Sequence, residues 1–349
     1  MVKMETNDAD QAADRIAISI IMPVYNGHEF ILKSLPPLIG MQQRGEVVEV
    51  IVVDDSSTDA SAELAANMGA CVIPSGGRLG PGAARNQAAT AVKGNILWFV
   101  DADVIVHEDA VRFIHEGFSD AGVVAIFGSY DDSPPAGNFL SQYKNLVHHF
   151  YHHRGRREAT TFWSGCGAVR KDAFLAVGGF DVERFTRPSI EDIELGYRLR
   201  AAGGRILLIP ELQSTHLKVW HFLNLIHTEV FCRAIPWSRL IFEQPEMAGD
   251  LNVSPAERMR AGLAGFFFLV LFAVLSGLLP WWSIAVAFTG VTLVNLELAK
   301  LFVRMKGPVF ALLGILFHQF YYLYSSAAFV YAWLEWKIDA RRKAEPGRG

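Results

Sequence analysis

Short apolar runs and segments of helical spacing alternate along the first hundred residues of the chain. The runs have strand length and are rich in β-branched residues; they cover residues 16–22, 47–53, 71–74 and 95–100. The segments between them have apolar positions at helical intervals; they cover residues 30–38, 60–68 and 83–92. Pro36 and Pro37 are expected to disturb the end of the first helix. Strands that alternate with helices predict an α/β fold with a mostly parallel sheet flanked by helices.

The pattern changes after residue 262, where most positions are apolar or aromatic. Three stretches there are long enough to cross a hydrocarbon core of roughly 30 Å; they cover residues 262–279, 281–303 and 309–334. Three full crossings would leave the basic residues 341–343 on the exported side, against the tendency of cytoplasmic loops to be basic. The sequence therefore predicts two or three transmembrane helices, with a re-entrant or interfacial segment as the alternative for one of them.

The composition limits the kinds of binding partner and the cellular compartment that fit this chain. The net charge of −4 gives no reason to expect a nucleic-acid partner. Three scattered cysteines suit reduced thiols in the cytoplasm better than a disulfide framework. Residues 1–15 are polar and contain no apolar run, so we expect a disordered N-terminus and no signal peptide. These features predict a multi-pass protein of the cell membrane whose first domain faces the cytoplasm.

The same patterns divide the chain into five parts. Residues 218–260 mix aromatic and basic side chains, which suits a helix lying in the membrane interface; a packed surface helix is the alternative. The predicted parts are a disordered N-terminus (1–15), an α/β domain (16–217), an amphipathic linker (218–260), a transmembrane region (262–334) and a basic tail (335–349).

Polar residues follow the predicted strands directly. They are Asn26, Asp54, Asp55, Asp101 and Asp103. Ligands of open α/β sheets bind beyond the carboxyl ends of the strands, so these side chains are expected to gather at one cleft. Two carboxylates one residue apart, as in Asp101-Ala-Asp103, can hold a hard cation such as Mg²⁺ or Mn²⁺. Such a pair is also common on solvated loops, so it needs support from other motifs.

Six motifs supply that support, because together they resemble family 2 glycosyltransferases of the GT-A fold. They follow the order and spacing of that family over residues 18–217; they are Pro23-Val-Tyr-Asn26, Asp54-Asp-Ser-Ser-Thr-Asp59, Gly80-Pro-Gly-Ala-Ala-Arg-Asn86, Asp101-Ala-Asp103, Gly178-Gly-Phe-Asp181 and Glu191-Asp192. The resemblance implies a metal-dependent hexosyltransferase that inverts the configuration of a sugar taken from a nucleotide-sugar donor.

The resemblance also assigns roles by position. It implies a donor site formed by Pro23, Tyr25, Asp54 or Asp55, Arg85 and Asp101. It places Asp103 at the metal and diphosphate, with Asp101 near the metal as well. It makes Asp192 the catalytic base, with Glu191 orienting the site. A helix start would keep Asp192 ionised, which agrees with that role; a residue that merely caps the helix is the alternative.

Further candidates rest on weaker patterns. His216 is a late histidine of the kind that completes the metal site in related enzymes, and a hydrogen-bonded core histidine is the alternative. Gly165 and Arg233 are expected on the acceptor side. The pairs His148/His152 and His149/His153 have the spacing of a helical zinc site, but no third ligand is evident, so a solvated or acceptor-facing helix is favoured.

Three functions remain compatible with these patterns. The first is transfer of the sugar to a hydroxyl of a lipid, lipid-linked or glycan acceptor at the cytoplasmic membrane face. The second is a polyprenyl-phosphate sugar synthase; its phosphate nucleophile needs no base, which Glu191-Asp192 argues against. The third is a non-catalytic binding protein on the same fold, against which the complete set of acidic residues speaks.

Overall fold

The computed structural model describes residues 16–245 and 254–344. Within these residues the chain forms two compact units. The first contains residues up to 129 together with residues 157–217, and the second contains residues 130–156 together with those from 218 onward. Residues 130–156, which the sequence analysis counted with the α/β domain, thus lie in the second unit.

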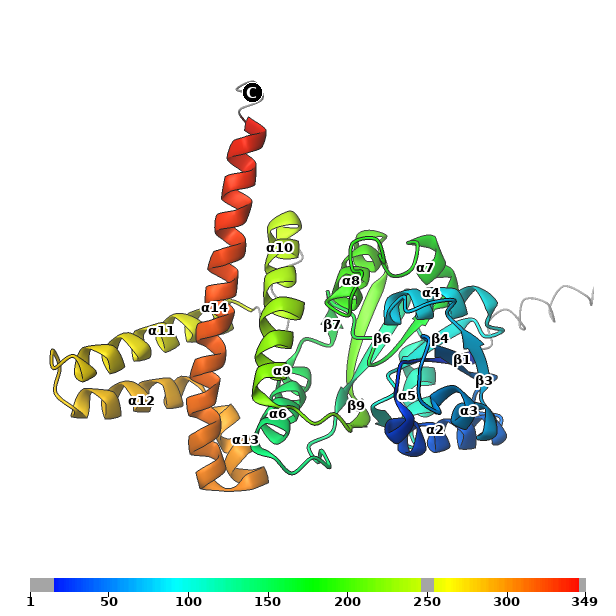
Figure 1. Ribbon diagram of the computed structural model, residues 1–349, viewed down its shortest axis with the longest axis horizontal. Coiled ribbons are helices and arrows are strands. Elements are labelled where there is room, and N and C mark those ends of the chain that lie inside the picture. Colours follow the sequence, from blue (N-terminus) through cyan, green and yellow to red (C-terminus); the bar gives the residue numbers. More distant parts are fainter. Residues whose placement is uncertain (1–15, 246–253, 345–349) are drawn as a thin grey trace, which may run out of the picture. The chain divides into compact units, whose positions relative to one another are not determined.

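The first unit is built around a nine-stranded sheet within the described residues (Figure 1). Its strands run in the order β3-β2-β1-β4-β8-β6-β9-β5, with β7 paired to β9. They are β1 (Ile18–Val24), β2 (Glu49–Asp54), β3 (Cys71–Pro74), β4 (Ile96–Val100), β5 (Val104–Val106), β6 (Val123–Tyr130), β7 (Glu158–Ala159), β8 (Cys166–Arg170) and β9 (Arg205–His216).

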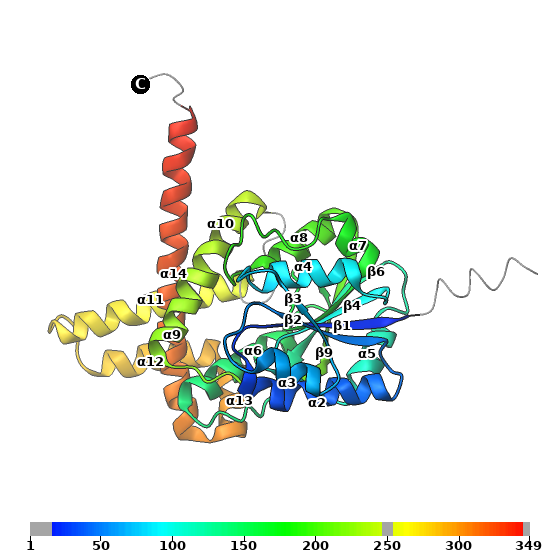
Figure 2. The same cartoon turned by 45° about the vertical axis from the view of Figure 1, so that its right-hand side comes forward.

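Helices cover both faces of this sheet. Figures 1 and 2 show α4, α7 and α8 on one face and α2, α3 and α5 on the other. Their bounds are α2 (His28–Gln43), α3 (Ser61–Asn67), α4 (Pro81–Ala91), α5 (Ala110–Gly117), α7 (Lys171–Ala176) and α8 (Glu191–Ala201). Apolar side chains of the central strands, such as Ile20, Val52 and Phe99, are fully buried between the two layers. The predicted α/β fold with flanking helices is confirmed.

The sheet is mixed, whereas the sequence predicted it to be mostly parallel. Strands β1 to β4 pair in parallel, as expected from the alternation of strands and helices. Strand β8 then runs antiparallel to both β4 and β6, and β5 runs antiparallel to β9. The apolar runs indicated which segments are strands, but they carry no information on the direction of a partner that comes from far along the chain.

Three elements run through a proline, and for the first strand and the first helix this corrects the predicted end. Strand β1 continues through Pro23 because its pairing with β4 ends at Ile21, so the proline lies where only β2 is a neighbour. Strand β9 continues through Pro210 to His216, because β7 pairs with it before this proline and β5 pairs after it.

Helix α2 is the third such element, since it runs through Pro36 and Pro37 to Gln43, beyond the predicted end at residue 38. The two prolines remove backbone hydrogen bonds. Leu35 and Leu38 on the inner face are fully buried, and this packing outweighs the local preference.

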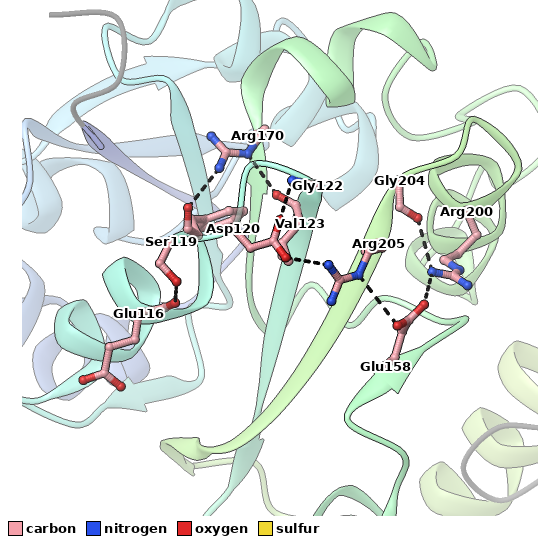
Figure 3. Close-up of polar contacts among 11 residues, drawn as sticks. Glu116, Ser119, Asp120, Gly122, Val123, Glu158, Arg170, Arg200, Gly204 and Arg205 are labelled. Atoms are coloured by element: carbon pink, nitrogen blue, oxygen red, sulfur yellow. Dashed lines mark hydrogen bonds and ion pairs between the residues drawn. The ribbon is translucent and has the colours of Figure 1, made fainter. Parts of the chain in front are cut away.

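Ion pairs and hydrogen bonds connect residues at the rim of the first unit (Figure 3). Arg205 of β9 pairs with Asp120 at 2.5 Å, and Arg200 of α8 pairs with Glu158 at 2.8 Å. Arg170 donates to the carbonyl oxygen of Val123 at 2.9 Å. The acidic partners are about half exposed, so each pair contributes little to stability. Asp120 is therefore a suitable control position for substitutions of other acidic residues.

The second unit is helical. Its helices are α6 (Phe139–Arg154), α9 (Phe222–His227), a π-helix η1 (Thr228–Ala234), α10 (Ile235–Glu243), α11 (Pro255–Leu275), α12 (Trp282–Val294), α13 (Leu296–Lys306) and α14 (Pro308–Ala344). Pro236 lies in the first turn of α10, where it needs no backbone donor, so it does not interrupt the helix.

The predicted membrane spans are only partly confirmed. Within the described residues, α11 is the one helix long and apolar enough to cross a membrane. The pair α12 and α13 passes the same test only if a helix bent by 87° counts as one span. Residues 309–334 lie in α14, which buries His318 and Gln319 and is not among these candidates. The prediction of two or three spans is therefore reduced to one or two.

Candidate active site

The acid pair predicted at the end of the fourth strand lies beside a buried arginine. Arg85 of α4 is 2% exposed, and its Nη2 donates to Oδ1 of Asp101. Desolvation raises the pKa of Asp101, Arg85 lowers it, and the nearby charges of Asp103 and Asp192 raise it further. The Nε of Arg85 has no hydrogen-bond partner within the described part of the chain. A buried donor of this kind is satisfied by a water molecule or by a ligand oxygen when one is present.

His216 lies next to Asp103, as the sequence suggested. Strand β9 pairs with β5 so that His216 is opposite Val104, the residue after Asp103. The Nε2 of His216 is 3.5 Å from Oδ2 of Asp103. Two ligands that each lie about 2.1 Å from one ion are roughly 3 to 3.5 Å apart, so this separation fits a shared divalent metal.

The chain supplies only part of such a metal site. No group of three or more His, Cys, Asp or Glu side chains arranged for a metal occurs among residues 16–245 and 254–344. A divalent ion at Asp103 and His216 would take its other ligands from diphosphate oxygens and water, which suits Mg²⁺ or Mn²⁺. The residues therefore fit a metal that arrives with a nucleotide.

The Glu191-Asp192 motif begins α8 and reaches the same site. Asp192 accepts hydrogen bonds from the backbone N–H of Ser164 at 3.1 Å and of Ile193 at 2.9 Å. The next residue, Gly165, accepts from the backbone N–H of Asp101 at 3.2 Å through its carbonyl oxygen. One short turn thus places Asp192 with respect to Asp101. A side chain at Gly165 would collide with the ring of Trp163, so the turn requires glycine.

Glu191 is nearly buried, with an exposed fraction of 8%. Desolvation raises its pKa to about 7; the charge of Asp192 adds to this effect, and Arg85 opposes it. One carboxylate oxygen accepts a hydrogen bond from the backbone N–H of Ser189 at 2.7 Å. The two adjacent acids thus differ in environment, and Glu191 holds a proton over much of the acidic and neutral range.

We expect Glu191→Gln to stabilise the protein at pH 8. Glu191 has an ordinary pKa of 4.5, so between that pH and about 7 the folded state binds more protons than the unfolded state. Stability therefore falls as pH rises through this window. The amide carries no charge to desolvate, and the gain at pH 8 should be on the order of 1–3 kcal/mol, fading toward pH 5. Urea unfolding at both pH values measures it.

The matched control for this measurement is Glu183→Gln. Glu183 is exposed, so its replacement should change stability by a similar small amount at both pH values. Equal stability of the Glu191→Gln variant and the parent at pH 8 would contradict the buried, proton-holding carboxyl.

A reciprocal pair of hydrogen bonds joins two of the sequence motifs. The side chain of Asn86 donates to the carbonyl oxygen of Phe180 and accepts from its backbone N–H, both at 2.8 Å. Gly179 has a φ of +69°, and a Cβ there would collide with the side-chain oxygen of Asn86. The Gly-Gly-Phe-Asp segment is therefore held against α4, beside Arg85. The resemblance named both motifs but gave no reason for their pairing.

The loops at the ends of β1, β2 and β3 form the remaining part of the predicted donor site. Asp55 is buried, and its carboxylate accepts from the backbone N–H groups of Leu79 and Gly80, each at 2.8 Å, so it holds the glycine-rich loop. Asp54 is more exposed and accepts from the backbone N–H of Ser57.

One aromatic ring and one guanidinium lie at the surface of this region. Tyr25 is 39% exposed, and the guanidinium of Arg78 lies 4.1 Å from its ring centroid. Arg78 was missed by the sequence analysis, although its place in a glycine-rich loop was a usable signal. Pro23 is buried within β1 and contributes to the strand rather than to an exposed surface.

Other predicted site residues lie in the second unit. Arg233 is in η1, where it donates to Glu229 at 2.9 Å, and Lys144 of α6 contacts the same carboxylate at 2.8 Å. His148 and His152 stack with ring centroids 3.9 Å apart, and His149 and His153 at 3.8 Å. The acceptor-side role predicted for Arg233 stays a prediction.

Comparisons with known proteins find glycosyltransferases among the relatives of this chain. The family described as Glycosyl transferase family 2 matches residues 19–178. A poly(ribitol-phosphate) beta-glucosyltransferase of Bacillus spizizenii is 37% identical over 103 residues, which cover 27% of this chain and 16% of that protein. The pre-mycofactocin glycosyltransferase of Mycobacterium tuberculosis is 27% identical over 219 residues, which cover 58% of this chain and 44% of that one. The chain thus spans less than half the length of these curated relatives.

The fold has a counterpart of nearly the same extent among solved structures. The mannosyltransferase PcManGT from Pyrobaculum calidifontis, solved in complex with GDP-Man and Mn²⁺, superposes with a TM-score of 0.53 at 18% identity. The match covers 90% of this chain and 87% of that one. The likeness confirms the predicted GT-A fold. Residues 19–178 match the family described as Glycosyl transferase family 2, and the relatives named above are glycosyltransferases.

Proposed function

We propose that this protein transfers a sugar from a nucleotide-sugar donor, with inversion, to a hydroxyl of a lipid, lipid-linked or glycan acceptor at the cytoplasmic membrane face. The observation that carries the proposal is the convergence of Arg85, Asp101, Asp103, His216 and Asp192, which come from α4, the end of β4, the end of β9 and the start of α8. Two turns, one at Gly165 and one at Gly179, hold these elements in place.

The donor side of the site contains a cationic side chain, Arg85, beside the acidic side chains of Asp101 and Asp103. Arg85 offers a buried N–H group without a protein acceptor in the described ranges, which a diphosphate oxygen would satisfy. Asp101, tied to Arg85, fixes the direction of the guanidinium. Asp103 and His216 would hold Mg²⁺ or Mn²⁺. The ion, when bound, offsets the charge that develops on the leaving nucleoside diphosphate.

The acceptor side requires a base. Inversion in one step needs a group opposite the leaving nucleotide that takes the proton of the acceptor hydroxyl. Asp192 has both oxygens directed by backbone N–H groups, so its orientation is fixed before an acceptor arrives. Glu191 beside it is nearly buried, and its carboxylate accepts a hydrogen bond from the backbone N–H of Ser189, which suits a residue that orients the site.

The donor-side loops are the proposed nucleotide contacts. Tyr25 and Arg78 present a ring and a guanidinium at the surface, where a base would stack. Asp54 and Asp55 stay candidates for the nucleoside, and Asp55 has the added task of holding the glycine-rich loop. An apolar helix in the second unit, α11, keeps the protein at the membrane that carries the acceptor.

A panel of nucleotide sugars tests the proposal. The purified full chain is incubated with each donor, Mn²⁺ or Mg²⁺ and membrane lipids, and release of nucleoside diphosphate is measured. One donor should stand out, and the product should have the anomeric configuration opposite to that of the donor. Retained configuration would contradict the one-step inversion. Absence of diphosphate release with every donor and extract would contradict the transferase proposal.

A further inference from the structure

The helices α11 and α12 form a hairpin with a polar base inside the second unit. They pack along each other, and Figures 1 and 2 both show them side by side. At the base, the Nε of Arg260 donates to the carbonyl oxygen of Val294 at 3.0 Å, which sets the two helices at one level. Glu257, in the same turn of α11, accepts from Tyr151 at 2.8 Å and from Tyr322 at 2.6 Å. The base is thus fastened to α6 and α14.

Beyond this base the hairpin carries no charge. No Asp, Glu, Lys, Arg or His occurs between Arg260 and Glu297. The tip exposes large apolar side chains, with exposed fractions of 77% for Leu275, 75% for Leu278 and 78% for Trp281. A protruding surface of this kind is not stable in water, and it has the composition of a segment embedded in lipid.

The uncharged parts of the two arms are each shorter than the hydrocarbon core is thick. From residue 261 to Leu275, α11 rises about 22 Å, and α12 rises about 20 Å, at 1.5 Å per residue. The hydrocarbon core is about 30 Å thick. With its base at one headgroup layer, the hairpin ends within the far leaflet. Trp281 and Trp282 then come near the inner edge of the far headgroup layer, a depth that tryptophan favours.

Helix α13 does not extend the second arm into a full span. It turns by 87° from α12 at Asn295. Its apolar residues Leu298 and Phe302 are already buried in a cluster with Tyr143 and Leu146 of α6. Its other face carries exposed charged residues, among them Glu297 and Lys300. An amphipathic helix whose apolar face is mostly occupied in this way leaves little surface for hydrocarbon; Leu296 and Val303 are its exposed large apolar side chains.

We propose that the α11–α12 hairpin is a re-entrant membrane anchor that enters and leaves the bilayer on the same face. The occupant of its apolar surface is the lipid hydrocarbon. Exposed cations lie on the base turn of α11 and along α13, which follows the hairpin in the chain; they are Arg258, Lys300, Arg304 and Lys306. They suit the anionic lipids of the cytoplasmic leaflet. The inference deepens the membrane placement in the proposed function and rests on it, but it makes a separate statement about topology.

Accessibility of single cysteines tests this topology. The native cysteines Cys71, Cys166 and Cys232 are first replaced, and the full chain must keep its membrane association. Ser276→Cys places a thiol at the exposed tip, and Met259→Cys places one at the exposed base. Sealed vesicles of both orientations are treated with a bulky, membrane-impermeant polyethylene-glycol maleimide. We expect the base position to react only from the cytoplasmic face, and the tip to react from neither face until detergent is added.

Two other results would overturn the proposal. Labelling of the tip from the exported face would show that α11 crosses the membrane. Labelling of the tip from the cytoplasmic face, at the rate of the base, would show that the hairpin lies in water. Leu278→Cys, also at the tip, is a second variant in case the first does not fold. Transferase activity measured in the same vesicles is independent of the labelling, so failure of the proposed function and failure of the hairpin are told apart.

Discussion

Replacing Asp192 by asparagine is expected to lower sugar transfer by a factor of roughly 10² to 10⁴, the usual contribution of a positioned general base. Donor binding should stay nearly intact, because Asp192 is placed on the acceptor side. The amide has the same shape and keeps an oxygen that accepts from the backbone N–H of Ser164 or Ile193, so the turn should survive. Single-turnover transfer and donor affinity, measured on the same variant, give the result.

The same variant separates the two enzymatic hypotheses. A polyprenyl phosphate is already anionic and needs no base, so a synthase of that kind should lose much less activity. Asp120→Asn is the matched control, because Asp120 is a surface acid paired with Arg205 at the rim of the sheet and should leave transfer unchanged. Near-normal transfer by the Asp192 variant would remove this residue from the catalytic role and favour the phosphate acceptor.

Asp103→Ala should abolish metal-dependent binding of the nucleotide. The loss should exceed roughly 100-fold, because changes in residues that only orient a metal ligand already cost 10- to 100-fold. The fold should persist, since the backbone carbonyl of this residue, which accepts from the N–H of Leu217 at 2.8 Å, is unchanged in the alanine variant. Calorimetry with a nucleoside diphosphate, in Mn²⁺ or Mg²⁺ and in chelator, measures the effect.

Two further variants test whether the metal binds at Asp103 in particular. His216→Gln should weaken the same metal-dependent binding, because its ring lies 3.5 Å from the carboxylate of Asp103. Asp120→Asn should bind like the parent protein. If Asp103→Ala binds nucleotide and metal with unchanged affinity, the assignment of the metal to the Asp-x-Asp pair is wrong.

Local patterns in the sequence predicted the parallel half of the sheet and the clustering of acids. Each apolar run ends where a polar residue begins, so the positions of Asp54 and Asp101 at strand ends follow from the order of residues alone. Long-range pairing was beyond such patterns. The bond between Asn86 and Phe180 joins residues 94 positions apart, and nothing local to either residue requires the other.

The sequence predicted which residues belong to the candidate site better than it predicted the role of each one. The resemblance offered Asp54 or Asp55 without choosing, and only the hydrogen bonds to Leu79 and Gly80 show that Asp55 also holds a loop. Ser164 was not predicted, because its contribution is a backbone N–H that every residue except proline has. Burial, which decides the pKa of Glu191, is a property of the whole fold and not of its neighbours in the chain.

The π-helix η1 makes the segment between α9 and α10 tolerant of the loss of one residue. A π turn contains one residue more than an α turn, so deletion of one residue among 228–234 would allow an ordinary helix to close without a break. The chain would then enter α10 with nearly the same direction around the helix axis. Trp237 and Leu240 would stay on the buried face. Relatives that lack one residue here should therefore keep the same apolar face of α10, although their sequences align with this chain only across a gap.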